Sequence, residues 1–136
     1  MTVKSIKIFK NKVIKNKKGN IIKYVTLQNK FFKKFGEIYF NEIYFNKKKG
    51  WILHKKNFCL IICIYGKVKF HFIDNKLNER IISLKSGTGK IIKIPPQIWF
   101  SFQSFDKKSI IANLIEKPHQ DNEVVKKVKV KNYLIK

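Results

Sequence analysis

The sequence predicts an all-β protein with a single domain, a sandwich or barrel of antiparallel strands, on three observations. Short runs of β-branched and aromatic residues recur at spacings of about eight to twelve residues. Turn-forming clusters separate these runs, at 16–20 (NKKGN), 46–50 (NKKKG) and 106–109 (DKKS). No segment before residue 120 shows the roughly 3.6-residue apolar period of an amphipathic helix.

The first half of the chain contains five expected strands, each rich in residues that favour β-structure. Residues 2–9 (TVKSIKIF) and 21–28 (IIKYVTLQ) combine isoleucine and valine with lysines on one face. Residues 37–45 (EIYFNEIYF) consist largely of isoleucine, tyrosine and phenylalanine. Residues 51–54 (WILH) then lead into the apolar run 57–66 (NFCLIICIYG).

The second half continues the same pattern to the C-terminal tail. Residues 67–74 (KVKFHFID) alternate cleanly, so that a valine and two phenylalanines share one face and a histidine lies on the other. Further short runs follow at residues 79–85, 90–94, 98–105 and 110–116. The tail, 121–136, fits either a short helix or a last strand.

Length and composition fit one folded domain over residues 1–136. Hydrophobic residues make up 44% of the chain and aromatic residues 14%, enough for a real core. The longest uncharged apolar run, 58–66, is far shorter than the roughly 20 residues of a membrane helix, and no signal peptide is evident. Cys59 and Cys63 would lie about 13 Å apart on one strand face, too far for a disulfide. We expect buried free thiols in a cytoplasmic protein without a membrane partner.

The charge is strongly positive, with 31 lysines and arginines against 8 acidic residues and a net charge of +23. All of these cations except Arg80 are lysines, and they are spread along the whole chain. Proteins that read nucleic acid lean on arginine for bidentate contacts. We therefore expect a general attraction to phosphorylated ligands and no nucleic-acid partner. A basic nucleic-acid-binding barrel stays as the less favoured alternative.

Two motifs resemble those of cupins, small jelly-roll barrels. In GKIIKIPPQIWFSF (89–102), Gly89 is followed after five residues by Pro95, and Phe100 stands where the second cupin motif has a histidine. The first cupin motif has a counterpart in Gly50, His54 and the glycine that closes the next strand. The resemblance implies a cupin-type jelly-roll β-barrel.

Three segments in order narrow this resemblance: GWILHKK, YGKVKFHFID and IPPQIWFSF. Over roughly residues 36–125 the chain resembles the dTDP-4-dehydrorhamnose 3,5-epimerases and the sugar 3,4-ketoisomerases. The resemblance implies an isomerase for a dTDP-linked 4-keto-6-deoxy sugar, in the synthesis of surface polysaccharides or deoxysugars. It also implies a homodimer in which N-terminal strands add to the partner's sheet. A sugar-nucleotide-binding cupin without activity is the alternative.

No metal and no other cofactor is expected. Metal-binding cupins need two or three histidines and a carboxylate around one ion. Here Ile52 and Phe100 occupy two of the histidine positions, and no glutamate follows His54 in its strand. The nucleotide-sugar branch of the fold instead needs a base beside the 4-keto group and a group that stabilises the enolate.

His54 is the candidate base, because neutral histidine is available at cytoplasmic pH. It should share a strand face with Ile52, toward the barrel interior; the alternative is a structural histidine. The resemblance places a catalytic tyrosine about where Asn113 stands, so Asn113 is the second candidate catalytic residue. His71 is expected outside any site. His119 lies in an expected loop from which it could reach the mouth of the site.

Five residues are candidates for binding the substrate. Trp51 and Trp99 could stack on a base or a sugar, and Gln103, which shares the face of Trp99, could bind a sugar hydroxyl. Lys55 and Lys56 could hold an enolate oxygen or a phosphate. The alternatives are core packing for the tryptophans and solvated charge for the lysines.

Overall fold

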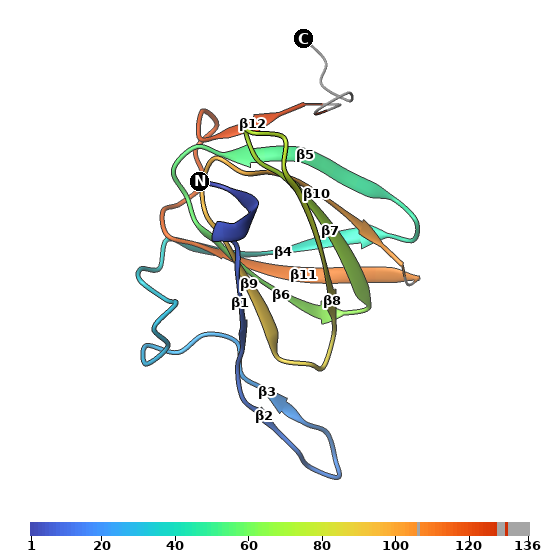
Figure 1. Ribbon diagram of the computed structural model, residues 1–136. Helices are drawn as coiled ribbons and strands as arrows, with labels where there is room; N and C mark the ends of the chain where they lie inside the picture. The colour runs from blue at the N-terminus through green and yellow to red at the C-terminus, as the bar shows by residue number, and fades with distance from the viewer. Residues whose placement is uncertain (106, 128–129, 131–136) are drawn as a thin grey trace.

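The structure is a computed structural model that describes residues 1–105, 107–127 and 130. Figure 1 shows two five-stranded sheets packed face to face, with a two-stranded hairpin extending from one end. All pairings between named strands are antiparallel. After a short 3₁₀ helix, Val3–Ser5, the strands are β1 (Lys7–Lys10), β2 (Val13–Ile14), β3 (Ile21–Ile22), β4 (Glu37–Tyr44), β5 (Lys48–His54), β6 (Cys59–Tyr65), β7 (Lys67–Ile73), β8 (Glu79–Lys85), β9 (Lys90–Ile94), β10 (Trp99–Ser104), β11 (Lys108–Ile115) and β12 (Val124–Lys126). Within the described part of the chain, no helix is long and apolar enough to span a membrane.

The strand order defines the jelly roll. The first sheet has the order β1-β9-β6-β11-β4 and the second the order β12-β5-β10-β7-β8. From β4 onward the chain changes sheet at every connection except the hairpin β7–β8. Pro95 and Pro96 form the corner between β9 and β10, where the chain passes from one sheet to the other. Their fixed φ angles suit a rigid corner that no ladder hydrogen bond crosses.

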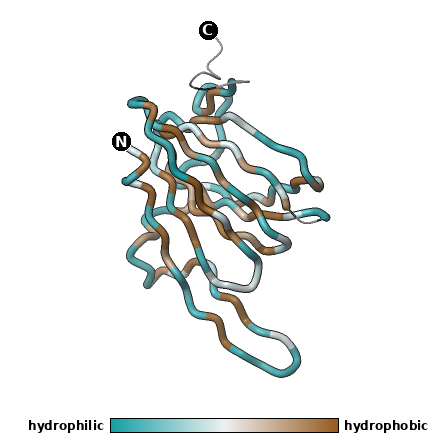
Figure 2. The backbone as a smooth tube through the Cα atoms, turned by 45° about the vertical axis from the view of Figure 1, so that its right-hand side comes forward, coloured by the Kyte–Doolittle hydropathy of each residue, from teal (hydrophilic) through white to brown (hydrophobic). Residues whose placement is uncertain are grey.

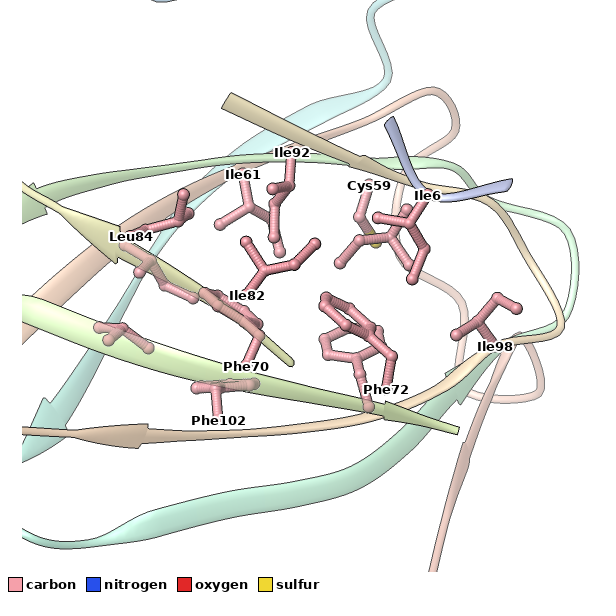
Figure 3. Packing of buried hydrophobic residues seen from close by; sticks show 14 of the residues in the cluster. Ile6, Cys59, Ile61, Phe70, Phe72, Ile82, Leu84, Ile92, Ile98 and Phe102 are labelled. Atoms are coloured by element: carbon pink, nitrogen blue, oxygen red, sulfur yellow. The ribbon is translucent and has the colours of Figure 1, made fainter. Parts of the chain in front are cut away.

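The core lies between the two sheets, as Figure 3 shows. Phe70 and Phe72 of β7 meet Phe102 and its neighbours of β10 on one side, while isoleucines such as Ile61 and Ile92 face them from the first sheet. The Phe70 and Phe102 ring centroids lie 5.4 Å apart. Along β7 the buried residues alternate with more exposed ones, as the period of two predicts.

Several expected elements agree with the structure. The strands expected at 79–85 and 90–94 have the observed bounds of β8 and β9, and the tail contains a strand, β12. Cys59 and Cys63 are buried and free, as expected. The remainder of the tail, 128–129 and 131–136, lies outside the described residues.

Three expectations in the N-terminal half are only partly correct. The run 2–9 begins as a 3₁₀ helix, because the Val3 amide donates to the Asp74 carboxylate and Arg80 donates to the Val3 and Ile6 carbonyls. The run 21–28 forms only a two-residue strand before the chain leaves for the outer face of the first sheet. The expected turn at 46–50 is partly strand, since β10 supplies a partner for the start of β5.

Candidate active site

A cavity of about 550 Å³ is lined by strands of both sheets. Its wall comes from β4, β5, β10, β12 and the loop before β12, so it forms only when both sheets are in place. The residues that line it are Glu37, Tyr39, Asn41, Lys49, Gly50, Trp51, Ile52, His54, Phe102, His119, Val124 and Lys126. The cavity therefore joins titratable side chains that lie up to about 90 residues apart in the sequence (126 − 37 = 89).

His54 is the last residue of β5 and lies on the same strand face as Ile52, as expected. Earlier in β5 a bulge interrupts its pairing with β10: Ile52 pairs with Phe100 and Lys49 with Phe102, so β5 has one extra residue between these pairs. The backbone carbonyl of His54 accepts a hydrogen bond of 2.8 Å from the Gln97 amide of the proline corner. The corner thus fixes the end of the strand that carries His54.

Glu123 is the carboxylate partner of His54. The Nδ1 atom of His54 lies 2.9 Å from Glu123 Oε2, and the two side chains are 4% and 11% exposed. The other carboxylate oxygen, Oε1, accepts hydrogen bonds from the backbone amides of Lys56 (3.1 Å) and Asn57 (2.7 Å). One oxygen of Glu123 is therefore held by the turn that follows β5, and the other by His54 at the end of β5.

These contacts determine the protonation of the pair. Burial would raise the pKa of Glu123, but the amides of Asn57 and Lys56 and the nearby His54 outweigh burial and lower that pKa. Burial lowers the pKa of His54 by more than Glu123 raises it. An ionised carboxylate can only accept, so the neutral imidazole carries its proton on Nδ1. Nε2 is then the basic ring nitrogen in a side chain that lines the cavity.

Tyr39 supplies a phenol beside Asn113. The two residues are directly opposite in the β4–β11 pairing, and Asn113 Nδ2 donates to Tyr39 Oη over 2.8 Å. Burial raises the pKa of Tyr39, so the phenol keeps its proton. Because Oη accepts from Asn113, its own hydrogen is available to an oxygen in the cavity. Asn113 is 3% exposed and does not line the cavity itself.

Two lysines and a second histidine complete the polar wall. Lys49 and Lys126 line the cavity from β5 and β12, and Lys49 Nζ donates to Asn41 Oδ1. His119 lines it from the loop before β12, where its backbone amide donates to Glu37 over 2.9 Å. His119, named from the sequence as able to reach the site, thus lines the same cavity as His54. In the described residues no group of three or more His, Cys, Asp or Glu side chains is arranged to hold a metal ion.

Of the expected tryptophans and Gln103, only Trp51 lines the cavity of His54. Trp51 borders the cavity, but its ring packs on the outer face of the second sheet with Trp99 and Val130. Gln103 shares the face of Trp99, as expected, and donates to Asn46. The inner face of β10 is occupied by phenylalanines instead.

The lysines of the turn after β5 also differ from their expected place. The side chains of Lys55 and Lys56 are exposed and do not line the cavity. Their backbones instead hold the Glu123 region, since the Lys55 amide donates to the Glu123 carbonyl. His71 lies outside the cavity, as expected, and its Nε2 is 2.7 Å from Glu79 Oε1.

Sequence reasoning missed Glu123 and Tyr39. Glu123 follows His54 by 69 residues, in a tail for which the sequence indicated no single structure. Tyr39 lies on the half-buried face of β4, but the sequence does not show this, because the opposite face has Ile38 and Phe40; its place beside Asn113 depends on the pairing of β4 with β11.

Comparisons with solved structures find the same fold in nucleotide-sugar enzymes. A dTDP sugar isomerase from Desulfovibrio desulfuricans G20 has a TM-score of 0.86 at 24% identity, with 92% of this chain and 85% of that chain covered. A sugar 3,4-ketoisomerase from Thermoanaerobacterium thermosaccharolyticum, in complex with TDP, has a TM-score of 0.80 at 20% identity (90% and 88% covered). A dTDP-6-deoxy-D-glucose-3,5-epimerase from Legionella pneumophila Philadelphia 1 has a TM-score of 0.79 at 13% identity (89% and 71% covered). The expected jelly-roll fold is confirmed.

The family comparison covers nearly the whole chain. A search of curated proteins gives no match. Residues 3–134 match the family described as WxcM-like, C-terminal (FdtA). The resemblance to the nucleotide-sugar epimerases and ketoisomerases is confirmed at the level of the family. The chain belongs to the WxcM-like, C-terminal (FdtA) family.

Proposed function

We propose that this protein is an isomerase that acts on a dTDP-linked 4-keto-6-deoxy sugar, as an epimerase or a 3,4-ketoisomerase. The observation that carries the proposal is the pair His54–Glu123, whose neutral imidazole lies in a cavity that also contains the Tyr39 phenol. Proton abstraction beside a ketone needs this combination, a positioned base and a donor for the developing enolate oxygen. The solved enzymes with this fold include a ketoisomerase in complex with TDP-4-keto-6-deoxyglucose.

In the proposed reaction Nε2 of His54 takes a proton from the carbon next to the ketone. The electron pair of that C–H bond forms a C=C bond, and the ketone oxygen becomes an enolate that accepts a hydrogen bond from Tyr39. Glu123 stabilises the imidazolium that forms. Return of a proton to the same carbon from its other face gives an epimer. Protonation of the former carbonyl carbon by the imidazolium, with transfer of the adjacent hydroxyl proton to the enolate oxygen, moves the ketone.

The rest of the wall fits the nucleotide end of the substrate. Lys49 and Lys126 line the cavity, and their two ammonium groups would bind the negatively charged diphosphate of the substrate. Lys49 is oriented by Asn41, so it is held ready for an anion. We assign these two residues, rather than Lys55 and Lys56, to the diphosphate.

Deuterium exchange tests the proposal. Wild-type protein with dTDP-4-keto-6-deoxyglucose in D₂O should incorporate deuterium beside the ketone, and His54→Asn should lower this rate by about 10²–10⁴-fold. His71→Asn, which changes a histidine outside the cavity, is the matched control. Binding of dTDP without exchange of any 4-keto sugar nucleotide would instead indicate a binding protein without activity. Stabilisation by a DNA or RNA oligomer and not by dTDP would favour the nucleic-acid alternative.

We also propose that the protein is a homodimer. β4 is an edge strand of the first sheet, and edge strands can pair with a strand of another chain. Its outer face also exposes Ile38, Phe40 (64% exposed) and Tyr44 (66% exposed), an apolar patch suited to an interface. The hairpin β2–β3 projects from the body in Figures 1 and 2 and exposes Ile14 and Ile21, which is consistent with an arm that reaches a second copy. A two-stranded hairpin alone is only marginally stable in water.

Sedimentation tests the dimer. Wild type should sediment at twice the monomer mass of 16.2 kDa, and Phe40→Lys should shift it toward the monomer. Leu77→Lys, at an exposed loop position away from β4, is the control. A wild-type mass near that of the monomer would contradict the proposal.

A further inference from the structure

A second cavity, of about 330 Å³, lies on the outer face of the first sheet. It sits between β1, β9 and the chain that precedes β4, and it shares no residue with the cavity of His54. Three lysines and three phenylalanines line it together with Ser5: Lys7, Lys30, Lys93, Phe9, Phe31 and Phe58. We call it the basic hollow.

Strand pairing brings its lysines together. Lys7 of β1 and Lys93 of β9 are directly opposite in the register of the two strands, where the Cβ atoms of a pair lie about 4.5–5.5 Å apart. Like charges in that arrangement repel each other. Lys30 adds a third ammonium from the loop, and of the neighbouring charges Lys33 adds to the repulsion while Glu116 opposes it. The hollow therefore has an excess of positive charge.

Lys93 is half-buried, with its ammonium group against an aromatic ring. Its Nζ donates to the Phe31 carbonyl over 3.0 Å and lies 4.7 Å from the centroid of the Phe58 ring. Burial lowers the pKa of Lys93, so its charged form lacks part of the hydration of an exposed lysine. The rings of Phe9 and Phe31 stack with centroids 4.6 Å apart and present an apolar wall beside the ammonium groups.

From this geometry we propose that the basic hollow binds a phosphate-bearing small molecule with a planar ring, of the nucleoside monophosphate class. Lysines bind phosphate as point charges, and bases stack on aromatic side chains. The volume of the basic hollow lies at the lower end of the roughly 300–1,000 Å³ typical of small-molecule sites. The opposed lysines Lys67 and Lys85 on β7 and β8 line neither cavity, which makes them an internal comparison.

Nuclear magnetic resonance of the full chain titrated with AMP tests the site. Amide shifts are expected at Lys7, Phe9, Phe31 and Phe58. A response confined to residues 49–54 would place AMP in the cavity of His54 and overturn the proposal. Because this readout does not involve isomerase activity, its outcome is independent of the proposed function.

Variants separate a built site from general attraction to a basic protein. Lys93→Met and Lys7→Met should each weaken AMP binding by about tenfold or more, the effect of losing one charged hydrogen bond. Lys7→Met should leave the melting temperature unchanged or higher, because it removes the like charge opposite Lys93. Lys85→Met should not change AMP binding. An equal loss in Lys85→Met and Lys93→Met would overturn the proposal.

The aromatic wall has its own test. Phe58→Leu should weaken binding of AMP more than binding of ribose 5-phosphate, which has the phosphate but no base. Inorganic phosphate should bind less tightly than AMP. Equal affinities for AMP and inorganic phosphate would refute a ring-bearing ligand.

Discussion

Replacing Glu123 with glutamine should reverse the tautomer of His54. The side-chain oxygen of the new glutamine can still accept from the Asn57 and Lys56 amides, which lie 2.7 and 3.1 Å from Glu123 Oε1. The NH₂ group of the glutamine then faces Nδ1 of His54, which in the wild type lies 2.9 Å from a carboxylate oxygen. Nδ1 must accept, and the proton moves to Nε2. The nitrogen that should take the substrate proton is then blocked.

The magnitude follows from the two functions that the carboxylate loses. A hydrogen bond to a charged group contributes about 1.5–3 kcal/mol, or roughly one to two powers of ten in rate if it acts on the imidazolium. Loss of the correct tautomer removes general-base catalysis, worth about 10²–10⁴-fold. We expect kcat/KM to fall by at least about 10²-fold, with dTDP affinity nearly unchanged.

The pH dependence of kcat/KM sharpens this prediction. In the wild type kcat/KM should rise with pH through the pKa of free-enzyme His54, which burial holds below the ordinary 6.5. Glu123 raises that pKa, so its loss should move the inflection to still lower pH. Glu79→Gln is the matched control, because Glu79 pairs with His71 at 2.7 Å outside the cavity. Unchanged kcat/KM in Glu123→Gln, or an inflection that moves upward, would refute the reasoning.

Three further predictions concern the phenol, the bulge and acid stability. Tyr39→Phe should lower kcat by about 10²–10³-fold in steady-state kinetics, the cost of one enolate donor. It should also destabilise the fold by about 1–3 kcal/mol in urea unfolding, because Asn113 loses its acceptor. An unchanged kcat would exclude Tyr39 as the enolate donor. Gly50→Ala should lower the free energy of unfolding in urea more than Gly87→Ala does. Both glycines have positive φ, but of the two only Gly50 would place a Cβ 2.7 Å from a backbone oxygen. Equal losses of unfolding free energy in the two variants would contradict this. The melting temperature should fall as pH drops below about 6.5, because native His54 binds a proton less readily than the unfolded chain; His54→Asn should flatten this dependence, and an equally steep fall in that variant would argue against it.

Some of the site could be read from the sequence because the signal is local. His54 and Ile52 are two residues apart on a strand, so they share a face whatever the strand packs against. The same period correctly put Trp99 and Gln103 on one face. It could not say which face of β10 points inward, because that strand has aromatic residues on both. Only the packing against the first sheet placed Phe102 inside and Trp99 outside.

The sequence by itself determined the all-β class and the strands whose patterns alternate or are bounded by glycine and proline. These features depend on interactions between near neighbours in the chain. Tertiary structure alone decided that Glu123 meets His54 and that Tyr39 lies beside Asn113, because both contacts span more than sixty residues. Such contacts depend on the order of strands in the two sheets, which pairing across the whole barrel selects and no short segment encodes.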